Sequence, residues 1–233
     1  MLDKIVAKTE ERLIESKSNK SLEELKEEVS KLDVNDEFPF KKALKDPEIA
    51  REYEQAGASA ISVLTEPYFF KGSNDFLKEI SENVSIPILR KDFTIDEYMI
   101  YEAKLLGASA ILLIVSILDD VQLKAYLDLA HDLGLSAIVE THDADEIKTA
   151  IDAGAGIIGV NNRNLADFTV DIENSINLRR LVSDDIIFIS ESGIKTKEDV
   201  TRLKENDVDA VLIGETLMRS DDKKSMILEL KNG

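Results

Sequence analysis

The stretch GASAILLIV, at residues 107–115, decides how the rest of the sequence is interpreted. Its first glycine follows an amphipathic helical pattern at 96–106, and its first five letters recur at 57–61. A continuous run of Val, Ile and Leu without strict alternation is typical of a strand that is covered on both faces. The repeat therefore predicts units in which a helix ends at a glycine and leads directly into a buried parallel strand.

Similar apolar runs occur seven times. The predicted strands cover residues 58–65, 85–89, 108–115, 136–139, 156–160, 186–190 and 209–213. Amphipathic stretches at 96–106, 119–133 and 143–153 predict helices between them, and each is followed by a glycine. No glycine-rich dinucleotide loop follows an early strand, so the pattern favours a (β/α)8 TIM-barrel type of α/β fold, with only seven evident strands, over a doubly wound sheet.

The residues before these units predict an N-terminal helical extension. Residues 1–32 have the pattern of two helices, and Ser21 and Glu24 have the spacing of a capping box at the start of the second. We expect residues 1–45 to form this extension and residues 46–233 to form the βα barrel, within a single domain overall.

Composition excludes several classes of partner. The chain has 47 acidic and 29 basic residues, a net charge of -18, which argues against binding to nucleic acid. The longest nearly apolar stretch, 108–118, is too short to cross a membrane, so no membrane partner is expected. The absence of cysteine excludes a disulfide framework and is typical of a cytoplasmic protein.

Polar residues follow the predicted strands, where barrels of this type carry their chemistry. They are Glu66, Arg90, Lys91, Asp92, Ser116, Glu140, His142, Asn161, Asn162, Arg163, Glu191, Ser192, Gly214 and Glu215. Strand ends become polar where they reach solvent, and this accounts for any single one of these residues. A lysine and two glutamates at three separate strand ends nevertheless form an acid and base set, and the glycines at 193 and 214 predict two loops whose amides bind a phosphate.

One alternative for the fourth strand end is a metal site. Glu140, His142 and Asp143 are close in sequence, but no cysteine ligand accompanies them. We therefore predict no metal.

Six motifs in order resemble the indole-3-glycerol-phosphate synthase family of tryptophan biosynthesis. They are ISVLTE at 61–66, ILRKDF at 88–93, VETH at 139–142, GVNNRNL at 159–165, SESGI at 190–194 and GETLM at 214–218. The resemblance implies a lyase, a decarboxylase without a cofactor, that closes the indole ring of the phosphorylated substrate 1-(2-carboxyphenylamino)-1-deoxyribulose 5-phosphate with loss of CO2 and water.

The resemblance also implies a role for each matching residue. Lys91 is the general acid at the ribulose carbonyl, Glu140 receives a proton during dehydration, and Asn161, Glu191 and Arg163 order the substrate and the catalytic network. Two further sets are implied by the same match: a phosphate cradle of Ser192, Gly193, Gly214 and the Glu215 amide, and apolar walls around the anthranilate ring from Phe70 and Phe93.

The chain departs from the family before residue 46. A Glu-x-Lys strand and a Ser-Pro-Ser loop are missing, a deficit of about two dozen residues and the length of one βα unit. Seven strands would leave an open seam through which the chain could form an oligomer. This leaves a second hypothesis open, a catalytically impaired, truncated or engineered homologue that binds a phosphorylated ligand or acts only in folding or assembly. Phosphoribosylanthranilate isomerase is disfavoured by the matches at 91–93 and 161–163.

Overall fold

The computed structural model describes residues 1–32, 57–164, 169–220 and 222–232. They belong to two compact units, and the division falls inside one strand, after Ile138. Of the described residues, 1–32 and 60–138 belong to the first unit, and 57–59 and those from 139 onward belong to the second.

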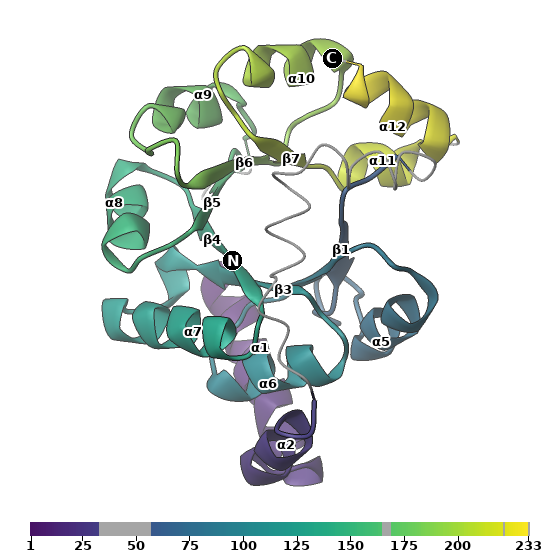
Figure 1. Cartoon of the computed structure of the whole chain (residues 1–233), viewed down its shortest axis with the longest axis vertical. Coiled ribbons are helices and arrows are strands. Elements are labelled where there is room, and N and C mark those ends of the chain that lie inside the picture. Colours follow the sequence, from purple (N-terminus) through teal and green to yellow (C-terminus); the bar gives the residue numbers. More distant parts are fainter. Residues whose placement is uncertain (33–56, 165–168, 221, 233) are drawn as a thin grey trace. The chain divides into compact units, whose positions relative to one another are not determined.

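The first unit begins with two helices and continues with alternating strands and helices (Figure 1). Its strands β1, β2 and β3 pair in parallel, with Leu64 opposite Lys91. The elements are α1 (Leu2–Asn19), α2 (Leu22–Val29), β1 (Ile61–Leu64), α5 (Asn74–Asn83), β2 (Ile88–Lys91), α6 (Glu97–Leu105), β3 (Ala110–Ile114), the 3-10 turn η1 (Val115–Ile117), α7 (Asp120–Asp132) and the first half of β4 (Ser136–Thr141).

The second unit repeats the same strand and helix alternation and ends with two helices. Its strands also pair in parallel, with Glu140 opposite Gly159 and Asn161 opposite Glu191. Besides the second half of β4, its elements are α8 (Ala144–Asp152), β5 (Ile157–Asn161), α9 (Glu173–Arg179), β6 (Ile187–Glu191), α10 (Lys197–Lys204), β7 (Ala210–Leu212), α11 (Glu215–Arg219) and α12 (Lys223–Lys231).

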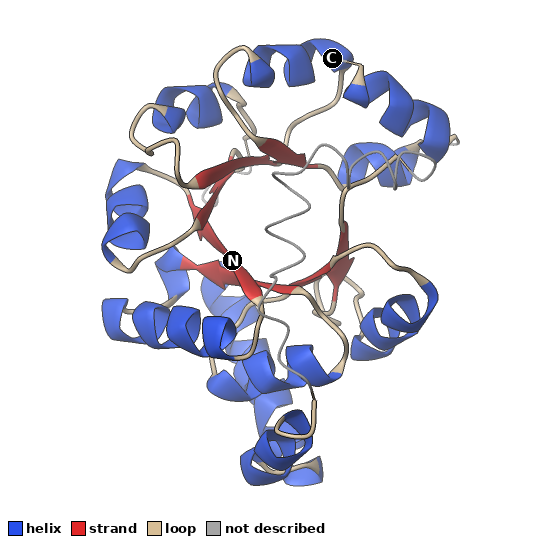
Figure 2. Cartoon of the chain, viewed as in Figure 1, coloured by secondary structure: helices blue, strands red, loops and turns tan. Residues whose placement is uncertain are grey.

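The strands follow one another in the sheet in the order in which they occur in the chain, β1 to β7. Figure 2 shows strands and helices alternating within each unit. A parallel sheet in sequential order with helical crossovers is the TIM-barrel type of α/β fold, so this prediction is confirmed, with seven strands among the described residues.

Buried aliphatic side chains explain why the strand sequences do not alternate. All five residues of β3 are buried, and Phe188 in β6 is fully buried. Four strands end later than predicted, since β2 continues to Lys91, β4 to Thr141, β5 to Asn161 and β6 to Glu191. Arg90, Lys91 and Glu140 are therefore paired residues within their strands rather than the first residues beyond them.

Local sequence signals set several helix ends. Ser21 and Glu24 form the predicted capping box at the start of α2. Gly107, Gly134 and Gly154 follow α6, α7 and α8 with φ angles of 84°, 68° and 89°, a left-handed conformation that favours glycine.

The N-terminal helices pack against the rest of the first unit. The Tyr98 hydroxyl donates a hydrogen bond to the Ser16 carbonyl at 3.1 Å, and Lys26 of α2 lies 3.2 Å from the Glu97 carboxylate of α6. The predicted boundary at residue 45, like the junction where the family's first strand is missing, lies outside the described residues. The single-domain assignment stays a prediction. None of the described helices has the length and apolar composition needed to cross a membrane.

Candidate functional site

In the first unit, the carboxyl ends of β1 and β2 hold Lys91 and two aromatic rings. Lys91 ends β2 and is half-buried. The rings of Phe70 and Phe93 have centroids 5.9 Å apart at an interplanar angle of 33°, and Phe70 is 44% exposed. Tilted rings at this spacing attract each other.

Glu66, another polar strand end, has a structural role. Its carboxylate is 1% exposed and accepts hydrogen bonds from the backbone amides of Tyr68, Phe69 and Phe70 at 2.7 to 3.0 Å. These bonds fix the loop that carries Phe70. Sequence alone does not separate this role from catalysis, because both place a carboxylate at a strand end.

Asp92 is the centre of a buried charge network behind Lys91. Arg12 of α1 donates from Nη2 to both Asp92 carboxylate oxygens at 2.9 Å, and Thr65 Oγ1 donates to Oδ2 at 2.6 Å. Burial raises the pKa of Asp92, but the positive charges of Arg90 and Arg12 and the hydrogen bonds lower it by more, so the group stays ionised. Helix α1 is thereby attached to the segment that positions Lys91 and Phe93. No sequence signal identified Arg12, since the pair spans 80 residues.

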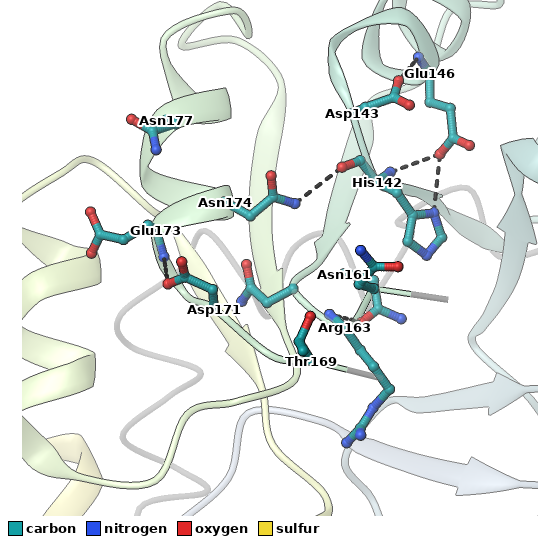
Figure 3. A pocket seen from close by; sticks show the side chains of 12 residues that line it. His142, Asp143, Glu146, Asn161, Arg163, Thr169, Asp171, Glu173, Asn174 and Asn177 are labelled. Atoms are coloured by element: carbon teal, nitrogen blue, oxygen red, sulfur yellow. Dashed lines mark hydrogen bonds and ion pairs between the residues drawn. The ribbon is translucent and has the colours of Figure 1, made fainter. Parts of the chain in front are cut away.

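In the second unit, the side chains of Asn161 and His142 approach the same carboxylate oxygen of Glu140. Asn161 Nδ2 donates to Glu140 Oε1 at 3.1 Å, and His142 Nε2 lies 3.7 Å from the same atom. On its other side, His142 Nδ1 lies 3.1 Å from Glu146 Oε2 (Figure 3). His142 was named from the sequence among the polar strand ends and weighed as a metal ligand, but its position between two carboxylates was not predicted. No group of three or more His, Asp or Glu in the described part of the chain could hold a metal ion.

Arg163 connects the segment after β5 to the start of α11. Its backbone amide donates to Asn161 Oδ1 at 3.1 Å, which together with the Asn161 contact to Glu140 fixes the amide orientation. Its guanidinium Nη2 donates to Glu215 Oε2 at 3.4 Å. The structure thus joins Glu140, Asn161, Arg163 and Glu215 in one chain of contacts.

Beneath this chain of contacts lies a buried polar cluster. Asn162 donates from Nδ2 to Ser190 Oγ at 2.9 Å and to the Ser192 carbonyl at 3.0 Å, and its Oδ1 accepts from Ser175 Oγ at 2.8 Å. Glu191, at the end of β6, is 1% exposed. The cluster ties the carboxyl ends of β5 and β6 to α9, so it supports the polar residues above it.

The two predicted anion loops, after β6 and β7, are joined by a hydrogen bond. Thr216 Oγ1 donates to the Ile194 carbonyl at 2.7 Å. Ser192 and Gly193 both have positive φ, 67° and 83°, and such a conformation in a non-glycine residue is uncommon and concentrates at functional sites. Helix α10 does not start directly after Gly193. It starts at Lys197, and Thr196 caps it, because Thr196 Oγ1 accepts the first-turn amide.

A polar pocket of about 610 Å³ opens beside His142 and Asn161 (Figure 3). Nine of its twelve lining residues have amide or carboxylate side chains; the twelve are His142, Asp143, Glu146, Asn161, Asn162, Arg163, Asn164, Thr169, Asp171, Glu173, Asn174 and Asn177. Such a lining suits a polar or hydrated ligand and not a large apolar one.

The fold and the polar strand ends define a βα-barrel enzyme that carries its chemistry at the carboxyl ends of parallel strands. The chain matches the indole-3-glycerol phosphate synthase family over residues 39–230 and belongs to that family. Its members are carboxy-lyases of tryptophan biosynthesis.

Curated relatives agree with the family assignment, and a solved structure agrees with the fold. The indole-3-glycerol phosphate synthase of Ruminiclostridium cellulolyticum is 50% identical over 256 residues, covering 99% of this chain and 98% of the relative. That of Lachnoclostridium phytofermentans is 58% identical over 184 residues, covering 79% and 68%. The crystal structure of 3-hexulose-6-phosphate synthase from Salmonella typhimurium matches 80% of this chain and 92% of its own with a TM-score of 0.65, and at 18% identity this shows the fold alone.

The alignment length bears on the predicted deficit of residues. The Ruminiclostridium alignment spans 256 positions, 23 more than the 233 residues of this chain. The relative therefore has residues without a counterpart here, in a number that agrees with one βα unit. Their location before residue 46 stays a prediction.

Proposed function

We propose that this chain catalyses the reaction for which its family is named. It closes the ring of 1-(2-carboxyphenylamino)-1-deoxyribulose 5-phosphate, with loss of CO2 and water, to give indole-3-glycerol phosphate. The observation that carries the proposal is the near full-length match to synthases at 50% identity, with an acid in β2, a base in β4 and two anion loops after β6 and β7.

Lys91 and Glu140 have the two proton-transfer roles. Ring closure requires a proton at the ribulose carbonyl as carbon attacks it, and Lys91, half-buried at the end of β2, is the donor. Dehydration requires a base that accepts a proton while the hydroxyl leaves, and Glu140 is that base. Asn161 supports this role because its amide holds Glu140 Oε1 at 3.1 Å.

The remaining residues order the substrate. Asn161, Arg163 and Glu191 hold the catalytic network, since Asn161 contacts both Glu140 and the backbone of Arg163. Phe70 and Phe93 flank the anthranilate ring with their tilted pair. No cofactor is required, because both the acid and the base are side chains of the chain itself.

The phosphate binds at the two loops after β6 and β7. Ser192, Gly193, Gly214 and the Glu215 amide form the cradle, and the hydrogen bond from Thr216 to Ile194 keeps the two loops together. Gly193 is constrained twice. Its φ is +83°, and a Cβ there would lie 2.3 Å from Val170 Cγ1.

Substitution of Gly193 tests the cradle. Gly193→Ala is expected to weaken the binding of inorganic phosphate, measured as competition against substrate, at least about tenfold, because loop backbone and Val170 must both move. The matched control is Gly154→Ala, which has the same left-handed φ of +89° but nothing within 4 Å of the added Cβ. Equal phosphate affinity in both variants would place the phosphate elsewhere.

The activity itself is tested by the fluorescence of indole-3-glycerol phosphate formed from the purified chain and its substrate. We expect product from the wild-type chain and a rate about 10²- to 10⁴-fold lower in Lys91→Ala, since loss of a general acid has this size of effect. A rate in Lys91→Ala equal to that of the wild type would remove Lys91 from the mechanism.

A second candidate function is favoured by the alignment positions, at least 23, that have no counterpart in this chain. In that case the chain is an impaired homologue that binds a phosphorylated ligand without turnover. The two are distinguished in one experiment, because the impaired homologue retains phosphate binding that depends on Gly193 and forms no fluorescent product.

The proposal extends to the chain's surroundings. Its partner is a small phosphorylated metabolite. Neither nucleic acid nor a membrane is a partner, and the net charge of -18 supports the exclusion of nucleic acid. The absence of cysteine supports a cytoplasmic location, and an open barrel seam would permit an oligomer.

A further inference from the structure

His142 lies between two carboxylates at the end of β4. Its Nε2 is 3.7 Å from Glu140 Oε1, and its Nδ1 is 3.1 Å from Glu146 Oε2. The His142 backbone amide donates to the same Glu146 oxygen at 2.7 Å, so both the peptide and the ring are fixed from α8. Nε2 is buried and makes no hydrogen bond, and Glu140 Oε1 lies 3.7 Å from it.

The charges around His142 are mainly negative. Glu140 faces the ring from β4, Glu146 from α8, and Glu191 contributes from β6. The β5 side offers the neutral amide of Asn161 and the pocket-lining Arg163, whose guanidinium pairs with Glu215 at 3.4 Å. From α9 and the segment before it, the charged groups Asp171 and Glu173 line the same pocket, as Asp143 does from the start of α8.

This environment favours the imidazolium form. Burial lowers the pKa of His142, but the hydrogen bond to Glu146 and the charges of Glu140, Glu146 and Glu191 raise it by more, so the net pKa lies above its ordinary value of 6.5. In that form both ring nitrogens are donors, one toward Glu146 and one toward Glu140.

We propose that His142 is a positioning residue for Glu140. Held by Glu146, it orients Glu140 Oε1 together with Asn161 and supplies a positive charge that keeps Glu140 in the carboxylate form needed to accept a proton. The inference rests on the proposed function and deepens it, because it adds a residue that acts on the base without touching the substrate.

The first test is the pH dependence of turnover. His142→Gln keeps a polar side chain but removes the charge, so the pKa of Glu140 should rise and the acid limb of kcat/KM should move to higher pH. A displacement of one pH unit lowers kcat/KM about tenfold on the acid side of the limb, whereas KM at neutral pH should stay within about twofold. Glu146→Gln removes the carboxylate that fixes the His142 ring, and it should shift the acid limb of kcat/KM in the same direction. His131→Gln changes the other histidine of the chain, which is exposed on α7, and should leave the profile unchanged.

The second test needs no turnover. In His131→Gln the chain has a single histidine, and NMR titration of its ring signals then reports His142 alone. We expect a pKa above the ordinary value, which falls when Glu140→Gln or Glu146→Gln is added, because either change removes a carboxylate that stabilises the imidazolium. Asp152→Asn, at the exposed end of α8, is the matched carboxylate control and should leave the titration unchanged.

The outcomes separate this inference from the proposed function. An unshifted acid limb in a folded His142→Gln variant of an active enzyme overturns the positioning role and leaves the function standing. If that variant does not fold, the titration decides, and a His142 pKa that does not change with Glu140→Gln overturns the inference. A wild-type chain that forms no product at any pH overturns the proposed function and the positioning role with it, even if the titration shows the coupling.

Discussion

Replacing Glu140 with Gln is expected to lower kcat about 10²- to 10⁴-fold while KM changes only a few-fold. Gln has the same length, and its carbonyl oxygen can still accept the hydrogen bond that Asn161 donates at 3.1 Å, so the geometry around position 140 should persist. What the amide cannot do is accept a proton from the substrate. Because that transfer occurs only along the reaction path, the loss falls on turnover rather than on binding.

The measurement is steady-state fluorescence of the indole product over a range of substrate concentrations. Glu205→Gln, an exposed residue after α10, is a matched control in the same unit and should retain wild-type kinetics. A loss in Glu140→Gln below about tenfold, or one that appears as a raised KM with normal kcat, would mean that Glu140 binds substrate and does not transfer the proton.

Replacing Arg90 with Ala is expected to reduce the free energy of unfolding by about 3 to 5 kcal/mol. Arg90 is 2% exposed, and its guanidinium donates to the Met99 carbonyl at 2.7 Å and to the Glu102 carboxylate at 2.6 Å, with Asp92 at 3.5 Å. Asn74 and Thr65 accept two further hydrogen bonds. The truncated variant leaves a cavity and removes the main counter-charge of buried carboxylates, and both effects destabilise the fold.

Equilibrium unfolding in denaturant measures this difference. The control is Arg202→Ala, whose ion pair with Glu173 joins two partly exposed side chains, 55% and 37% accessible, and should contribute at most about 1 kcal/mol. Arg90→Lys should recover only part of the loss, because an ammonium cannot reproduce the several directed bonds of the guanidinium. A loss of unfolding free energy in Arg90→Ala no larger than that of the control would mean that the hydrogen bonds and ion pairs of Arg90 do not stabilise the fold.

The repeating strands and helices could be predicted from the sequence because their signals are local. Buried apolar runs such as 108–115, capping residues such as Ser21, and glycines such as Gly107 act on neighbouring residues, and all seven predicted strands are present. The ends of β2, β4, β5 and β6 were placed too early, because polar residues were taken as the end of each strand. Backbone pairing continues through them, with Lys91 opposite Leu64 and Glu140 opposite Gly159.

The sequence by itself determined the fold type, the family and the identity of the polar residues at the strand ends. It could not assign a role to each of them. Only the tertiary structure decided that the Glu66 carboxylate binds three backbone amides, that Arg90 is buried among carboxylates, and that His142 lies between Glu140 and Glu146. The physical reason is that backbone conformation and apolar burial follow from neighbours along the chain, whereas hydrogen bonds and pKa values depend on distances of a few ångströms between residues far apart in sequence, such as Arg12 and Asp92.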